Sequence, residues 1–233
     1  MQVYAASDIG LIRKRNEDSL FIDRQAGVFA VCDGMGGHKG GDVASKMAVA
    51  ALADTVQQAD RPEDFLTAAV VAANTNIYTK SLIEPALQGM GTTMTSVHIE
   101  RQHLSVRHVG DSALFLLRDR QISKLTTDHT LAAAIYNNNT SGTLNADHPY
   151  THVLTRAVGI RPDIEIESLT YHLQERDILI ICSDGLTDHV EPGEFIAVYN
   201  KLEHLRQYPQ QLINLALQRG GLDNITVIVI EID

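Results

Sequence analysis

The sequence has few cysteines, few basic residues and no long apolar run, and each shortage excludes a class of protein. Only two of the 233 residues are cysteines. Cys32 and Cys182 both end apolar runs, so we interpret them as buried thiols rather than as a disulfide. Lysine and arginine total 19 against 29 aspartate and glutamate residues. The resulting net charge of −10 argues against nucleic acid or an anionic membrane surface as the main partner.

The sequence also lacks the usual signals of secretion and membrane insertion. No apolar run approaches the roughly 20 residues that a membrane-spanning helix needs. The first six residues lack the basic start and the apolar region of a signal peptide, so we expect a cytoplasmic protein. Because no repeat or linker interrupts the chain, its length suits one domain over residues 1–233.

The most informative stretch is an apolar run, Val28 to Cys32, that ends at the carboxylate of Asp33 and leads into a glycine-rich loop. Five of the eight residues from 34 to 41 are glycines, which permit positive φ and a close approach of main chain to a ligand. Lys39 occupies the place of the third glycine of a dinucleotide loop, and Gly40-Gly41-Asp42 replaces the Gly-Lys-Ser/Thr of a Walker loop. The acid is better suited to holding a cation, which can then hold a phosphate.

Patterns of apolar residues predict two packed sheets with helices outside. Three apolar runs without polar alternation predict strands covered on both faces: 28–32, 178–182 and 225–230. Weaker strand patterns lie at 3–6, 20–22, 92–99, 104–109, 113–117 and 164–171, and the short turns between neighbours favour antiparallel pairing. Helical spacing is found at 43–58, 62–80, 192–199 and 209–218. We interpret the polar stretch 136–147 as a mobile lid.

Four aspartates stand at predicted strand ends, each close to a glycine. Asp33 and Asp184 follow apolar strands, Asp223 precedes one, and Asp111 ends another. The exit of one antiparallel strand lies beside the entry of the next, so these carboxylates can converge. Packed carboxylates repel one another unless a divalent cation lies between them, and an all-oxygen set selects Mg²⁺ or Mn²⁺ over zinc. The alternative, that each aspartate only caps a turn, explains one such junction better than four.

Seven short motifs follow one another along almost the whole chain: Arg13-x-x-Asn16-Glu17-Asp18, Asp33-Gly34-Met35-Gly36-Gly37-His38, Gly91-Thr92-Thr93, Gly110-Asp111-Ser112, Asp128-His129-Thr130, Ser183-Asp184-Gly185-Leu186 and Gly221-x-Asp223-Asn224-Ile225-Thr226. With them the chain resembles the metal-dependent protein serine/threonine phosphatases of type 2C, in their bacterial form. The resemblance implies an α+β fold, a four-layer α-β-β-α sandwich of two antiparallel sheets flanked by helix pairs. It also implies a flap segment near 131–155.

The resemblance further implies a centre of two Mn²⁺ or Mg²⁺ ions. In the family pattern, Asp33 bridges the two ions and the carbonyl of Gly34 binds one of them. Asp184 and Asp223 match the residues that bind the other ion. Asp111, together with Asp184, matches the residues that take a third ion in bacterial members.

Three more residues receive roles from the resemblance. Glu17 and Asp18 match acids that hold metal-bound waters or coordinate directly. Arg13 matches the arginine that binds the substrate phosphate. A guanidinium suits this role independently of the family, because its planar fork can bind two phosphate oxygens at once. The implied catalytic residues are therefore Arg13, Asp33, Asp184 and Asp223.

The expected reaction follows from these residue types. Phosphate monoesters hydrolyse extremely slowly, and two metal ions about 3.5–4 Å apart can activate and orient a bridging water. We therefore expect hydrolysis of phosphoserine and phosphothreonine by in-line attack of a metal-bridging hydroxide. The expected partners are phosphorylated proteins and a bacterial serine/threonine kinase that the enzyme opposes, with no nucleic acid or membrane partner and a monomeric chain.

Some positions depart from the family pattern or carry weaker hypotheses. Met35 stands where animal members place a histidine proposed as general acid, so a metal-bound water or His38 would protonate the leaving oxygen. Ala113 replaces an arginine that usually supports Asp111. His129 is expected only to hydrogen-bond the neighbouring loop. Zinc between His148 and His152 is not expected, because Pro149 separates them and no third ligand is evident.

Two other functions compete with this interpretation. A catalytically inactive relative that only binds phosphoproteins would have lost a metal-binding acid or Arg13, and the sequence retains them all. A phosphatase for small metabolite esters is the alternative among enzymes, because nothing in the sequence reads the substrate beyond its phosphate.

Overall fold

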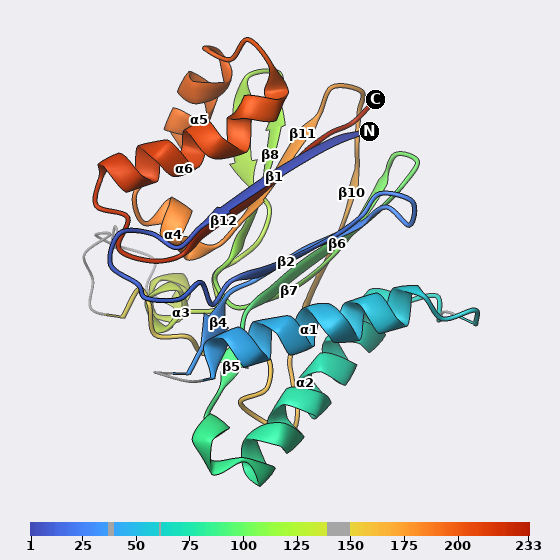
Figure 1. Cartoon of the computed structure of the whole chain (residues 1–233). Coiled ribbons are helices and arrows are strands. Elements are labelled where there is room, and N and C mark those ends of the chain that lie inside the picture. Colours follow the sequence, from blue (N-terminus) through green and yellow to red (C-terminus); the bar gives the residue numbers. More distant parts are fainter. Residues whose placement is uncertain (37–39, 61, 139–149) are drawn as a thin grey trace.

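The computed structural model describes residues 1–36, 40–60, 62–138 and 150–233, and its core is two five-stranded antiparallel sheets that lie face to face (Figure 1). The first sheet has the strand order β1 (Gln2–Asp8), β12 (Ile225–Glu231), β11 (Ile178–Cys182), β8 (Ala113–Arg118) and β9 (Gln121–Lys124). The second has the order β10 (Glu167–His172), β7 (His103–Val109), β6 (Met94–Glu100), β3 (Val28–Cys32) and β2 (Ser19–Asp23). A small sheet pairs β4 (Gly34–Met35) with β5 (Gly91–Thr92).

Helices cover the outer faces of both large sheets (Figure 1). The second sheet carries α1 (Gly41–Val56) and α2 (Phe65–Ile83), and the first carries α5 (Pro192–Tyr199) and α6 (Tyr208–Gln218). The short helices α3 (Leu131–Asn138) and α4 (Asp184–Thr187) lie toward one end of the sandwich, and 3₁₀ turns occur at η2 (Pro85–Leu87) and η3 (Leu205–Gln207). This arrangement confirms the predicted four-layer α-β-β-α sandwich.

The strand β3 shows why some strands contain no polar residue. Val28, Ala30 and Cys32 pack in the core beneath α1 and α2, whereas Phe29 and Val31 pack between the two sheets. Successive side chains of a strand point to opposite faces, and both faces of β3 are covered, so every position must be apolar. Cys182 is likewise buried at the end of β11, and both cysteines are free thiols, as predicted.

The structure corrects some of the expected element boundaries and adds a strand that was not expected. Residues 92–99 were expected as one strand, but Thr93 leaves the ladder to bond the main chain of Asp33, which separates β5 from β6. The helix expected from residue 62 begins at Phe65, because the side chain of Asp64 caps it by accepting a hydrogen bond from the amide of Thr67. Strand β9 was not expected, since it is an edge strand with one apolar residue.

The expected lid falls mostly on residues that the structure does not describe. Of the flap segment near 131–155, the structure describes α3 and the residues from 150 onward, while residues 139–149 lie outside the described part of the chain. His38 and His148 also lie outside it. Among the described helices, none combines the length and the apolar character that crossing a bilayer requires.

The chain that returns from the flap is fixed to α2 by a buried asparagine. Asn74 accepts a hydrogen bond from the amide of Gly159 at 2.7 Å and donates to the carbonyls of Arg161 and Pro162 at 2.9 and 3.1 Å. Asn74 is 2% exposed, so loss of its side chain leaves buried polar groups without partners.

We therefore predict that Asn74→Ala lowers the free energy of unfolding by at least about 2 kcal/mol, as measured by urea denaturation. Asn76→Ala, on the exposed face of the same helix, is the matched control and should change it by less than about 0.5 kcal/mol. Equal effects of the two substitutions would contradict this account of the segment.

Candidate metal centre

Five aspartates from separate segments gather at one end of the sheets, and we call them the acid cluster: Asp18, Asp33, Asp111, Asp184 and Asp223. Each lies next to the end of a strand: Asp18 before β2, Asp33 after β3, Asp111 between β7 and β8, Asp184 after β11 and Asp223 two residues before β12. The charges of Asp18, Asp184 and Asp111 all act on the carboxyl of Asp33, and those of Asp184 and Asp223 act on Asp18. The structure thus brings the predicted carboxylates together.

The acid cluster is electrostatically strained in the absence of a cation. Burial, and then the charges of Asp184 and Asp223, raise the pKa of Asp18 to about 7. Burial and neighbouring carboxylates raise the pKa of Asp33 and of Asp111 well above the ordinary value. Carboxyl groups in this state take up protons at a pH where isolated aspartates are ionised, so a bound cation would remove much of the repulsion.

Two atoms of the acid cluster lack the partners that buried oxygens normally have. Asp18 Oδ1 and Asp184 Oδ1 are both buried, and neither has a hydrogen-bond partner among the residues that the structure describes. A buried polar atom without a partner costs free energy, and such atoms in a native structure often mark an ion-binding position. Because all the donors are oxygens, these residues fit a hard divalent cation such as Mg²⁺ or Mn²⁺.

Threonine and serine hydroxyls fix the main chain that carries Asp33. The amide of Asp33 donates to Thr93 Oγ1 at 2.8 Å, and the Asp33 carbonyl accepts from the amide of Thr93 and from Thr92 Oγ1, both at 2.8 Å. Thr93 Oγ1 also lies 2.7 Å from Ser112 Oγ, beside Asp111. Hydroxyls of the Gly-Thr-Thr and Gly-Asp-Ser motifs therefore fix the main chain at Asp33 and beside Asp111.

A second set of hydroxyls holds Asp18. Ser183 Oγ donates to Asp18 Oδ2 at 2.8 Å and accepts from the amide of Thr226 at 2.9 Å. Thr226 Oγ1 in turn lies 2.7 Å from Ser7 Oγ. Because Asp18 Oδ2 is satisfied and Oδ1 is not, the carboxylate is fixed with one oxygen available.

Gly34 lies where the main chain is too crowded for a side chain. A Cβ at this position would lie 2.2 Å from the carbonyl oxygen of Gly41 and 2.6 Å from that of Glu17. A Cβ on Gly41 would meet Glu17 Oε2 at 2.5 Å, so Glu17 reaches the start of α1. Burial, and then the charge of Asp42, raise the pKa of Glu17.

Asn224 joins the two loops that border the acid cluster. Its Oδ1 accepts from the amide of Glu17 at 2.7 Å, and its Nδ2 donates to the carbonyls of Ile9 and Arg15, both at 2.9 Å. The loop between β1 and β2 is therefore bound directly to the residue that follows Asp223.

Arg13 lies at the exposed edge of the acid cluster. Its Nη2 donates to Asp223 Oδ2 at 2.5 Å, and its side chain is 54% exposed. The bond to Asp223 and the charges of Glu17 and Asp33 raise the pKa of Arg13, so the guanidinium stays charged. This position leaves further N–H groups of the fork available to a ligand at the cluster.

Two residues beside the acid cluster were missed by sequence reasoning. Asp188, just after α4, lies with Asp184 around His152, whose Nδ1 is 3.6 Å from Asp188 Oδ2 and 4.0 Å from Asp184 Oδ2. The carboxylates of Asp184 and Asp188 raise the pKa of His152 to about 9, and burial and Asp184 raise that of Asp188 to about 7. The position of Asp188, four residues after Asp184, was a signal in the sequence that could have identified it. Nothing in the sequence places His152 beside these two aspartates.

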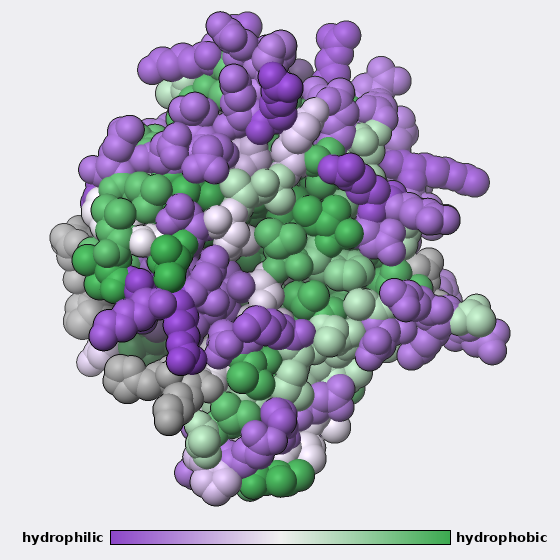
Figure 2. Space-filling view, in the orientation of Figure 1, coloured by the Kyte–Doolittle hydropathy of each residue, from purple (hydrophilic) through white to green (hydrophobic). Residues whose placement is uncertain are grey.

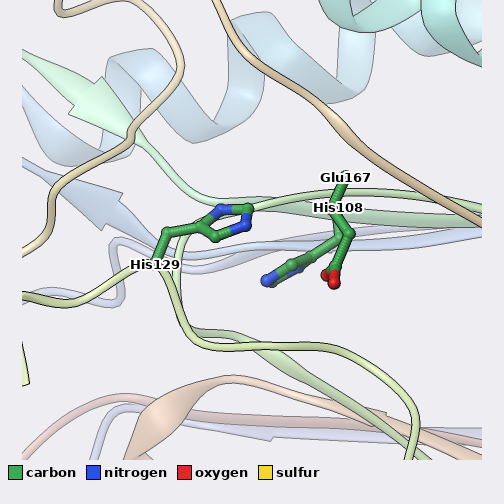
Figure 3. Close-up of side chains that lie close together, drawn as sticks. All are labelled: His108, His129 and Glu167. Carbon is green, nitrogen blue, oxygen red and sulfur yellow. The ribbon is translucent and has the colours of Figure 1, made fainter. Parts of the chain in front are cut away.

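A second group of potential ligands consists of His108, His129 and Glu167, whose side chains lie close together (Figure 3). The ring nitrogens of His108 face Thr95 Oγ1 at 2.8 Å and the carbonyl of Thr127 at 3.1 Å. Burial lowers the pKa of His108 to about 3 and that of His129 to about 4, so both rings are neutral near pH 7. Both ring nitrogens of His108 already have partners in the protein, so we interpret this group as part of the structural core and not as a metal site.

His129 was expected only to hydrogen-bond a neighbouring loop, and the structure places it against the loop of Asp111. The amide of His129 donates to the carbonyl of Gly110 at 2.8 Å, and the amide of Gly110 donates to His129 Nδ1 at 3.1 Å. Ala113, where the family usually has arginine, is fully buried in β8 opposite Cys182. The contacts of Gly110 with His129 therefore brace the Asp111 loop without an arginine at position 113.

Comparisons with known proteins agree with the geometry. A family model described as protein phosphatase 2C matches residues 13–218. The serine/threonine phosphatase stp of Listeria monocytogenes is 34% identical over 238 residues, which cover 97% of this chain and 94% of the relative.

Solved structures of serine/threonine phosphatases are also similar to this chain. The serine/threonine phosphatase of S. agalactiae has a TM-score of 0.92 at 32% identity, with 100% of this chain and 99% of that chain covered. The catalytic domain of the serine/threonine protein phosphatase PstP, solved in complex with 2 manganese ions, has a TM-score of 0.88 at 34% identity, with 100% and 98% covered.

The raised pKa of Asp18 predicts that metal-free protein becomes less stable toward unfolding as the pH rises. The folded-state pKa of about 7 exceeds the ordinary value of 3.8. The contribution of Asp18 to the free energy of unfolding is therefore fully present below about pH 4 and is lost as the pH rises through 7. Asp18→Asn keeps an acceptor for Ser183 without the charge. In EDTA at pH 8 we expect the variant to melt roughly 5 °C above wild type, and at pH 5 the difference should shrink. A variant less stable than wild type at pH 8 would contradict this explanation.

Proposed function

The chain belongs to the protein phosphatase 2C family, and from this premise we propose that it is a metal-dependent phosphatase of phosphoserine and phosphothreonine in proteins. The observation that carries the proposal is a cluster of half-buried carboxylates beside an exposed arginine, two of which have a buried oxygen without a partner among the described residues. Carboxylates alone would repel a phosphate dianion, so the cluster makes sense as a phosphate site only with cations in it.

We propose that the chain binds two Mn²⁺ or Mg²⁺ ions, as the manganese-bound PstP catalytic domain supports. Asp33 and the Gly34 carbonyl would hold one ion, and Asp33, Asp184 and Asp223 the other. Asp111 with Asp184 would hold a third. When bound, such ions lower the pKa of a water and offset the charge of the phosphate.

We also propose how the remaining acids of the site contribute. Glu17, half-buried beside the Gly34 main chain, would act through water. The unpartnered Oδ1 of Asp18 supports a direct ligand at that position.

Arg13 would bind the phosphate and orient it. Its bond to Asp223 holds one edge of the guanidinium, so the fork is pre-oriented and loses little freedom when a phosphate arrives. A dianion at this place would accept hydrogen bonds from the nitrogens that Asp223 does not use. Met35 lies in β4 and supplies no proton at the family's histidine position.

The wider setting of the enzyme is also a proposal. We propose a single catalytic domain over residues 1–233 with a flap near 131–155, acting as a cytoplasmic monomer. Its substrates would be phosphorylated proteins, and it would oppose a serine/threonine kinase. The net charge of −10 supports proteins over nucleic acid as partners.

We predict that Asp184→Ala lowers kcat for a phosphothreonine peptide in Mn²⁺ more than about 100-fold, because it removes an oxygen ligand from the centre of the acid cluster. Circular dichroism should show an unchanged fold. Asp163→Asn, on an exposed loop, is the control and should leave kcat unchanged. Full activity of Asp184→Ala would reject the assigned role.

We predict that Arg13→Ala raises KM for the same peptide about tenfold, with a smaller effect on kcat, because the guanidinium binds the phosphate before the reaction. Arg13→Lys should recover only part of the loss, since an ammonium lacks the planar fork. Steady-state kinetics measure both constants. An unchanged KM in Arg13→Ala would count against phosphate binding by this residue.

A further inference from the structure

Three large aliphatic side chains next to Arg13 and Asp223 are left exposed to solvent. We call Leu11, Ile12 and Leu222 the apolar rim, and they are 64%, 65% and 59% exposed, respectively. Leu11 and Ile12 directly precede Arg13, and Leu222 directly precedes Asp223. Exposed aliphatic side chains that cluster at a site, rather than being scattered singly, often mark a surface that binds a partner.

The apolar rim belongs to a fixed part of the structure. The amide of Leu11 donates to the carbonyl of Gly221 at 2.8 Å, and Asn224 ties the same loop at the carbonyls of Ile9 and Arg15. Gly10 has a φ of +78°, and a Cβ there would lie 2.2 Å from the carbonyl oxygen of Asp223. The two segments are thus in main-chain contact, and the exposure of the rim does not come from a loose loop.

The side chains of the rim lie on both segments of this contact. A Cβ on Gly221 would lie 3.4 Å from Leu11 Cγ, so Leu11 packs over the residue that precedes Leu222. Since Arg13 and Asp223 are joined by their ion pair, the rim is continuous with the proposed phosphate site. Figure 2 shows apolar surface directly beside strongly hydrophilic surface on the side of the molecule where the β1–β2 loop lies.

The charge of the same loop indicates what kind of chain would lie there. Arg13, Lys14 and Arg15 are consecutive and exposed, in a protein whose net charge is −10. A local group of cations beside an apolar surface complements a ligand that is both phosphorylated and apolar.

We propose that the apolar rim binds a large apolar side chain of the substrate protein, one or two residues from its phosphoserine or phosphothreonine. The inference rests on the proposed function and adds a substrate preference to it. An extended chain advances about 3.3 Å per residue, so a side chain that close to the phosphate at Arg13 reaches Leu11, Ile12 or Leu222. Burial of aliphatic surface on both partners provides the preference.

The test compares two phosphothreonine peptides that differ only in the residues flanking the phosphothreonine, leucine in one and serine in the other. We expect wild type in Mn²⁺ to favour the leucine peptide about tenfold in kcat/KM. In Leu11→Ser and Leu222→Ser the ratio of the two kcat/KM values should fall to about threefold or less. Leu82→Ser, which removes a 68% exposed leucine at the end of α2, is the matched control and should keep the wild-type ratio.

An unchanged ratio of the two kcat/KM values in both rim variants would overturn the proposal. If the unchanged ratio came with an equal loss of kcat/KM on both peptides, it would indicate a distorted site instead of a lost contact. Self-association of wild type that Leu222→Ser abolishes in sedimentation, with an unchanged ratio, would assign the rim to a contact between copies of the chain. If wild type cleaved neither peptide, the proposed function would fail as well, so the two failures are distinguishable.

Discussion

The repulsion among the half-buried carboxylates of the acid cluster is the constraint on which the rest of the structure depends. Five strand ends bring Asp18, Asp33, Asp111, Asp184 and Asp223 into one region, where burial of the first three weakens the screening of their charges by water. Such an arrangement is unfavourable by itself and becomes favourable once divalent cations bind. The folded protein is therefore expected to bind cations tightly, because folding has already brought the ligands together.

Residues of the short sequence motifs hold these carboxylates in place. Thr93 binds both main-chain groups of Asp33, and Ser183 fixes one oxygen of Asp18. Asn224 joins the loop of Arg13 to the segment of Asp223. Each of these residues is buried and touches an acid or its main chain, so the scaffold limits how far the carboxylates can move apart in response to repulsion. Preorganised ligands of this kind are what tight metal binding needs.

Much of this could be predicted from the sequence, and the failures have physical reasons. Buried strands such as β3 carry an unbroken apolar signal because both faces are covered, and the acids beside them stand out. Strand β9 gives no such signal, because it lies at a sheet edge with most of its residues exposed. His152 could not be placed beside Asp184, since that contact depends on tertiary packing of a segment without regular structure. The exposure of Leu11 and Leu222 was equally invisible, because a leucine in a sequence is expected to be buried.

The central claim is that these carboxylates exist to bind cations, and calorimetric titration of metal-free protein with Mn²⁺ tests it most directly. We expect uptake of at least two ions per chain in wild type, and loss of at least one of them in Asp33→Asn. The heat of binding should also depend on pH between about 5 and 8, since ions must displace protons from carboxyls with raised pKa values. Absence of manganese uptake by wild type, or an identical titration of Asp33→Asn, would contradict it.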